Sequence, residues 1–146
     1  MQVFAYPATL TPASAFAEGE TGFVVTFAAL PEAIAQGENE AEALAQAADA
    51  LEEAIAARIK RGDDIPAATA GNGIMVPVPT QTALKAALYL ALRGTRGSQS
   101  GLAARMVKDE KQVRRLLDPH HRSRPRSIER ALQMLGKRVS VVVEDA

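Results

Sequence analysis

The sequence contains no cysteine and no long apolar segment. None of its 146 residues is Cys, so the chain has neither a disulfide framework nor a thiolate metal site, and this suits a reducing compartment. No apolar run approaches the roughly 20 residues needed to span a bilayer. The first residues lack the basic segment and apolar stretch of a secretion signal. These absences predict a cytoplasmic protein that does not enter the membrane.

Carboxylates are missing where a metal-dependent active site would need them. Hydrolysis assisted by a divalent cation requires several inward carboxylates around the ion. The strands expected at residues 2–6, 22–27 and 33–36 contain no Asp or Glu. The only histidines, His120 and His121, are adjacent and precede an arginine-rich loop, which indicates a solvated or phosphate-contacting loop rather than a metal site. The sequence predicts no catalysis, no bound metal and no cofactor.

The net charge of zero conceals a separation of charge along the chain. Residues 1–70 carry 11 acidic and three basic side chains, a net charge of −8. Residues 71–146 carry six acidic and 14 basic side chains, a net charge of +8. This asymmetry suggests two partners, a nucleic acid for the basic half and a basic protein for the acidic half. The alternative is that the two halves attract each other.

Alternating apolar residues predict strands in the front half. The pattern is clear at 22–27, where Phe23, Val25 and Phe27 share one side, and it extends to residues 2–6 and 33–36. Residues 74–78 alternate with prolines, which are tolerated only at a sheet edge or in an extended linker. We therefore expect an antiparallel sheet, with residues 74–78 either at its edge or in an extended linker.

A long helix is predicted between the third and last strands. Asn39 begins it, and Glu42 completes a capping box. Gly62 is expected to end it. Its predicted buried stripe follows spacings of three and four, at Ala41, Leu44, Ala48, Leu51, Ile55 and Ile59. One apolar face per element predicts a helix packed on one side of the sheet.

The composition changes at residues 67–73, which are poor in large apolar residues and are expected to form a hinge or loop. We expect two domains, 1–79 and 80–146. Short helices punctuated by capping residues and glycines are predicted in the second domain, at 81–93, 99–107, 110–117 and 126–135. The predicted fold class is α+β, with an all-α second domain that ends in a strand.

That terminal strand is predicted at residues 138–144, where Val139, Val141 and Val143 lie on one side. A lone strand leaves its backbone groups without partners. The simplest solution is pairing with the same strand of a second copy, which predicts a homodimer or higher homo-oligomer through the second domain.

Residues 98–117 have the layout of a helix-turn-helix, with a short turn between two apolar faces. In that motif the second helix enters the major groove of DNA. Glutamine, lysine and arginine suit the direct reading of base edges, and loop arginines suit phosphates. The predicted DNA contacts are Ser98, Gln99, Lys108, Glu110, Lys111, Gln112, Arg115, Arg122 and Arg124. Val107 stands where a glycine often forms the turn, and the alternative is a helical packing module with a basic surface.

Several stretches together resemble the HicB antitoxin family, in the branch with a C-terminal helix-turn-helix domain. The resemblance covers most of the chain. In the front half it rests on GFVVTF (22–27), LPEA (30–33), the helix run at 37–55 and GDDIP (62–66). In the back half it rests on the more distinctive VPVPTQTALKAALYLALRG (76–94), VRRLLDPHHRS (113–123) and IERALQMLGKRV (128–139).

The resemblance implies a partial RNase H-like front domain that neutralises a small basic toxin of the HicA type, an mRNA-cleaving ribonuclease, by covering it. It also implies a back domain that binds operator DNA and represses the chain's own operon. Residues expected at or near the toxin surface are Phe27, Glu32, Glu38 and Asp63. The alternative is a helix-turn-helix transcription regulator whose front domain binds a small effector or another protein.

Overall fold

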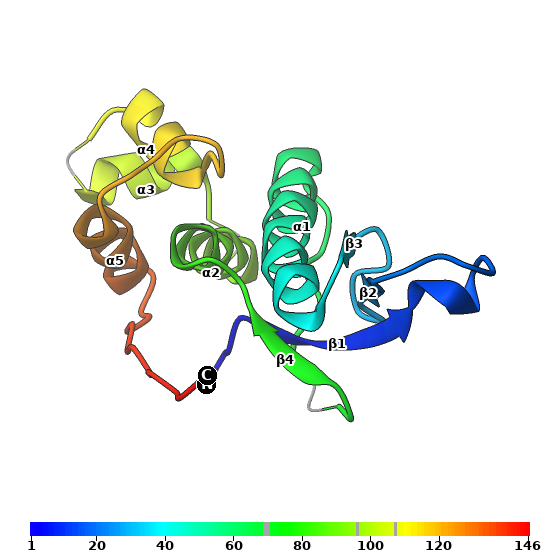
Figure 1. Ribbon diagram of the computed structural model, residues 1–146. Coiled ribbons are helices and arrows are strands. Elements are labelled where there is room, and N and C mark those ends of the chain that lie inside the picture. The colour runs from blue at the N-terminus through cyan, green and yellow to red at the C-terminus, as the bar shows by residue number, and fades with distance from the viewer. Residues whose placement is uncertain (69–70, 96, 107) are drawn as a thin grey trace. The chain divides into compact units, whose positions relative to one another are not determined.

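In a computed structural model, which describes residues 1–68, 71–95, 97–106 and 108–146, the chain forms two compact units (Figure 1). The first is Met1–Ala83 and contains a sheet with a long helix; the second is Leu84–Ala146 and is helical. The predicted mixed α+β class is confirmed. None of the helices in the described ranges is long and apolar enough to cross a membrane.

The sheet of the first unit is antiparallel, with strand order β3-β2-β1-β4. Its strands are β1 (Ala5–Pro12), β2 (Phe23–Thr26), β3 (Ile34–Gly37) and β4 (Ile74–Pro77). Strands β3 and β4 therefore form its two edges. The strands predicted around 22–27, 33–36 and 74–78 are confirmed to within a residue or two.

Strand β1 starts later and runs further than the predicted 2–6 segment, and its pairing explains how it accommodates two prolines. Residues 5–8 pair with β4, whereas residues 9–12 pair with β2. Each half of β1 thus has one neighbouring strand and one open side. Pro7 and Pro12 occupy the two halves, where a missing N–H need not interrupt a ladder on both sides.

Helix α1 (Glu40–Arg61) has the predicted signals at both ends. Asn39 Oδ1 accepts a hydrogen bond of 2.9 Å from the backbone N–H of Glu42, while Glu42 Oε2 accepts one of 3.3 Å from the N–H of Glu38. Gly62 adopts a left-handed φ of 76°, and its N–H donates to carbonyls of the last turn. The predicted start and end of this helix are confirmed.

The buried face of α1 differs from the predicted stripe in its first two turns. Ala41 is exposed, and Leu44 and Ala48 are half-buried, whereas Ala43 and Ala47 are fully buried. The stripe is correct from Leu51 onward. Alanines occupy most positions of the first turns, so spacing alone could not define the rotation of the helix; packing against β3 defines it instead.

The second unit contains most of α2 (Thr80–Gly94) together with α3 (Gln99–Met106), α4 (Glu110–Leu117) and α5 (Pro125–Met134). These helices confirm the four predicted ones, with ends shifted by at most one residue within the described ranges. The predicted turn residue Val107 lies outside those ranges. Residues of all four helices form one core: Leu88, Ala91, Leu102, Ala103, Val113, Leu116, Leu117, Ile128, Ala131 and Leu132.

The C-terminal strand predicted at 138–144 is absent from the single chain, so this prediction is wrong for the isolated molecule. The segment has no regular structure, and the side chains of Val141 and Val143 are 82% and 89% exposed. A strand exists only where a neighbour accepts its backbone hydrogen bonds, and the described sheet contains no strand from this segment.

Candidate nucleic-acid and protein interfaces

Helix α4 separates a basic face from an apolar one. Val113, Leu116 and Leu117 are buried in the core of the second unit. Lys111 and Arg115, four residues apart, are exposed on the opposite side. Exposed Glu110, Gln112 and Arg114 flank them. The predicted contacts from this helix therefore form one continuous solvent-facing surface, to which Arg114 also belongs.

The start of α4 is held by Asp109. Its Oδ1 accepts a hydrogen bond of 2.7 Å from the backbone N–H of Gln112, as expected for a helix cap. This hydrogen bond involves only the backbone N–H of Gln112. The side-chain amide of that residue lies on the exposed face. Glu110 in the first turn suits the positive end of the helix dipole, which gives it a structural role besides its predicted DNA contact.

The end of α4 is held by a buried lysine that sequence reasoning did not identify. Lys85 on α2 has no exposed surface, and its Nζ donates hydrogen bonds of 2.8 Å to the carbonyl of Arg115 and 2.8 Å to Ser123 Oγ. Burial lowers the pKa of Lys85 to about 8, and the charge of Asp118 opposes that shift. The signal for this residue was its place three positions before Leu88 on an otherwise apolar face.

The loop after α4 presents its two predicted arginines to solvent. Asp118 Oδ1 accepts a hydrogen bond of 2.9 Å from the N–H of His120, which shapes the start of the loop. Ser123 is turned inward toward Lys85, while Arg122 and Arg124 on either side of it are exposed. The Nζ of Lys85 therefore links this loop to the last turn of α4 by one hydrogen bond to each.

The remaining predicted DNA contacts have different surroundings. Ser98 Oγ accepts a hydrogen bond of 3.0 Å from the N–H of Gly101, so this side chain caps α3. Gln99 is exposed in the first turn of that helix, and Lys108 is half-buried between α3 and α4. Helices α3 and α4 pack against each other, which keeps these residues in the same unit as the basic face of α4.

The predicted toxin contacts do not form one site. Arg58, in the last turn of α1, donates two hydrogen bonds to the carboxylate of Glu32. The Nε–Oε1 distance is 2.5 Å and the Nη2–Oε2 distance is 3.1 Å. This bidentate hydrogen bonding keeps the pKa of the Glu32 carboxyl below its usual range. Asp63 is paired with Arg61 at 2.8 Å. Both carboxylates are thus balanced by arginines of the same unit.

The other two predicted toxin contacts lie elsewhere. Glu38 is exposed just before the first turn of α1, at the opposite end of a 22-residue helix from Arg58. Phe27 is 1% exposed and packs in the core, so its side chain is not on the surface of this structure. Within the described ranges, no three His, Asp or Glu side chains are close enough to hold a metal ion.

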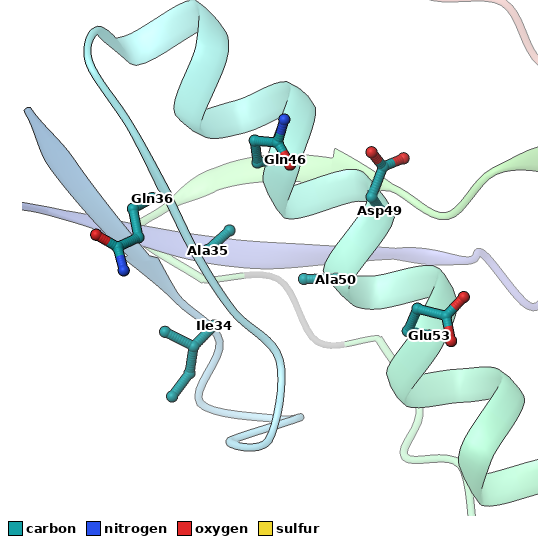
Figure 2. Close-up of a pocket in the computed structure, with 7 residues that line it drawn as sticks. All are labelled: Ile34, Ala35, Gln36, Gln46, Asp49, Ala50 and Glu53. Carbon is teal, nitrogen blue, oxygen red and sulfur yellow. The ribbon is translucent and has the colours of Figure 1, made fainter.

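A groove that the sequence did not indicate lies between β3 and α1 (Figure 2). Its cavity of about 420 Å³ is lined on one side by Ile34, Ala35 and Gln36 of β3 and on the other by Gln46, Asp49, Ala50 and Glu53 of α1. The helix residues follow a spacing of three and four, so they share one flank of α1. Strand and helix meet closely at one point beside the groove, because a Cβ on Gly37 would lie 2.3 Å from the nitrogen of Ala43.

Comparisons with known proteins agree over most of the chain. A family model described as HicB-like antitoxin of bacterial toxin-antitoxin system matches residues 5–87. "Antitoxin HicB" of Escherichia coli strain K12 is 35% identical over 140 residues, which cover 94% of this chain and 98% of that protein. "Antitoxin HicB" of Pseudomonas fluorescens strain Pf0-1 is 37% identical over 122 residues, 82% of this chain and 84% of that protein.

A more distant relative shows the same pattern. "Antitoxin HicB 1" of Photorhabdus laumondii is 30% identical over 139 residues, which cover 95% of this chain and 86% of that protein. These proteins form a regulatory family rather than a family of enzymes, which confirms the prediction that this chain is not an enzyme. The family match spans more than half of the chain, and the three relatives match over 82% to 95% of it. The chain belongs to the HicB-like antitoxin family of bacterial toxin-antitoxin systems.

Proposed function

We propose that this chain is a type II antitoxin that neutralises a HicA-like, mRNA-cleaving toxin and represses its own operon by binding operator DNA. The first unit covers the toxin's active surface, and the second unit binds DNA through a helix-turn-helix formed by α3 and α4. This assignment keeps the two activities on the two domains predicted from the sequence. The antitoxin names of the relatives support a toxin partner.

The observation that carries the proposal is the match between charge and structural units. Residues 1–83 contain 11 acidic and three basic side chains, and residues 84–146 contain six and 14. The net charges of −8 and +8 thus fall on separate compact units. An acidic unit is complementary to a basic ribonuclease, and a basic unit is complementary to phosphates.

The basic face of α4 supports sequence-specific reading of DNA. Lys111 and Arg115 are suited to guanine, and Gln112 is suited to adenine, each through two hydrogen bonds to a base edge. Arg122 and Arg124 in the following loop are suited to the phosphates beside the groove. Lys85 contributes indirectly, because it fixes the end of α4 relative to that loop.

Operator binding by a helix-turn-helix protein commonly uses two copies related by a two-fold axis. We propose that this chain forms a homodimer or higher oligomer through its second unit. The exposed valines of the C-terminal tail support this, because pairing with the tail of a second copy would satisfy their backbone and bury their side chains. Toxin binding would then alter the number and spacing of DNA-binding dimers on the operator.

The proposal is tested by co-expressing the tagged chain with each small open reading frame beside its gene. We expect capture of one basic protein that arrests growth when it is expressed alone and not when it is co-expressed. We also expect the purified chain to bind its own promoter. Specific promoter binding without any captured toxin would favour a regulator that responds to a small effector or another protein.

The division of labour predicts the behaviour of single variants of α4. Lys111→Ala or Arg115→Ala should weaken operator binding about 5- to 150-fold, because each removes roughly 1–3 kcal/mol of base contact. Neutralisation of the toxin should be unchanged. The measurements are operator affinity at fixed salt and the growth-rescue assay. Arg130→Ala on α5, which removes the same charge from an exposed position outside the predicted contacts, is the control and should change operator affinity less than threefold.

A further inference from the structure

We propose that the groove between β3 and α1 receives an extended, basic segment of the protein partner, which adds to the sheet as a new strand beside β3. This inference rests on the proposed function and specifies where the toxin is held. Neither Glu32 nor Asp63 lines the groove, and its lining residues are ones that the sequence did not suggest.

The two edge strands of the sheet differ in how well they are protected against the addition of another strand. A free strand edge offers a row of backbone donors and acceptors, and folded proteins protect such edges with prolines or charged side chains. β4 contains Pro77 and is followed by Pro79. β3 has the sequence Ile-Ala-Gln-Gly, with neither proline nor charge. Of the two, β3 is the edge that remains competent to pair with another strand.

The groove has the length of a short strand. Four residues of β3 span about 13 Å at the rise of an extended chain. The flank of α1 from Gln46 to Glu53 spans about 10 Å at the rise of a helix. The two walls in Figure 2 therefore run along a comparable length, which accommodates about four residues of an added strand.

The side chains around the groove favour an occupant of particular chemistry. An added strand would direct alternate side chains to opposite faces of the sheet. On the side of α1 they would meet the carboxylates of Asp49 and Glu53, which favour lysine or arginine. On the other side they would meet Ile34, a large apolar side chain that is 59% exposed. The segment that fits alternates basic and apolar residues, as expected in a strand of a small basic protein.

The test compares two double variants that change the net charge equally. Asp49→Lys with Glu53→Lys reverses both carboxylates of the groove. Glu18→Lys with Glu20→Lys reverses two exposed carboxylates in the connection between β1 and β2. The probe is the small basic protein encoded beside this chain's gene, purified in an inactive form. We expect at least tenfold weaker binding for the groove variant and less than threefold weaker binding for the control.

A second measurement uses the unaltered full-length chain and so does not depend on how a variant folds. Amide hydrogen exchange is compared with and without the probe. Strand addition should protect residues 34–37 and the flank at 46–53 at least tenfold, and should leave residues 13–22 unchanged. Protection of residues 34–37 that grows with the concentration of the chain alone would instead identify a second copy as the occupant and overturn the proposal.

The remaining outcomes separate this inference from the proposed function. If the groove variant binds the partner as tightly as the unaltered chain and β3 gains no protection, the proposed binding in the groove is overturned while the antitoxin function stands. If both double variants lose binding equally, the attraction is a general effect of charge, and the proposed binding in the groove is again overturned. If the unaltered chain binds no neighbouring basic protein, the proposed function and the inference fail together.

Discussion

A single buried amine connects two parts of the proposed DNA-binding surface. Lys85 Nζ has two acceptors, the carbonyl of Arg115 and the hydroxyl of Ser123. A neutral amine has two N–H donors, so it satisfies both acceptors without a buried charge. Burial lowers the pKa of Lys85 to about 8, so the amine is mostly protonated at neutral pH and loses its charge as the pH rises above about 8. Lys85 is thus a positioning residue that acts through the end of α4.

The sign of this shift leads to a test by pH. Between about pH 8 and 10.5 the unfolded chain holds a proton on Lys85 that the folded chain has lost, so this residue makes the unfolding free energy rise with pH. The slope is at most about 1.4 kcal/mol per pH unit. Lys85→Met should abolish this contribution, as measured by chemical denaturation across that range.

The same variant removes two hydrogen bonds and leaves the carbonyl of Arg115 with fewer donors. We expect a loss of about 1–3 kcal/mol in stability of the second unit near pH 8. Lys111→Met is the matched control, because it removes an exposed lysine and should change stability by less than about 0.5 kcal/mol. A Lys85→Met protein with the parent's pH slope would contradict this account.

Helix α1 approaches strand β3 closely, and a glycine permits the contact. A Cβ on Gly37 would lie 2.3 Å from the nitrogen and 2.7 Å from the Cα of Ala43. Both neighbours are backbone atoms, so neither can rotate away as a side chain would. The contact therefore fixes the distance between the strand and the helix beside the groove.

We accordingly expect Gly37→Ala to separate β3 from α1. The cost should be about 1–3 kcal/mol of unfolding free energy, as for other overpacked positions. Chemical denaturation followed by circular dichroism measures it. Gly94→Ala is the control, because a Cβ there meets no atom within 4 Å and the expected change is small. Equal stability of the two variants would show that the strand and helix can separate without penalty.

Element positions could be predicted where local chemistry specifies them. The capping box of Asn39 and the left-handed Gly62 bracket α1 in the sequence and in the structure. The rotation of α1 could not be predicted, because alanines give its first turns no distinct apolar face. Strand β1 was cut short at Tyr6, since its prolines are compatible with a strand only when each half pairs on one side.

The candidate sites were predictable to different degrees for a similar reason. The basic face of α4 follows from helical periodicity, which places Lys111 and Arg115 together and opposite the apolar residues. The groove depends on the tertiary pairing that leaves β3 at an edge, and no local pattern encodes this. Lys85 was missed because a lysine among apolar residues is usually read as exposed.

At the scale of the whole molecule, the C-terminal tail is the feature that suggests association with a second copy of the chain. The strand expected there requires a neighbour, and within the described sheet the single chain provides none. The exposed side chains of Val141, Val142 and Val143 form a short β-branched segment with strong strand preference. An assembly of two copies would resolve the difference between the sequence prediction and the single chain.

Deleting residues 140–146 should therefore shift the chain toward the monomer and weaken operator binding at least tenfold, because two half-sites would no longer be bound together. Sedimentation and operator titration measure the two effects. Replacement of Glu144 and Asp145 by alanine keeps the valines and is the control. A truncated chain that remains dimeric and binds the operator fully would place the dimer contact elsewhere in the second unit.

The opposite charges of the two units have a consequence for handling the protein in solution. A chain with 17 basic and 17 acidic residues would ordinarily pass through an ion-exchange column near its isoelectric point of about 6.7. Here the acidic excess lies on one unit and the basic excess on the other, so a resin of either sign meets a unit that carries eight net charges of the opposite sign. The purified antitoxin should be retained by both anion and cation exchangers at neutral pH, and toxin and operator DNA should each suppress one of these two retentions.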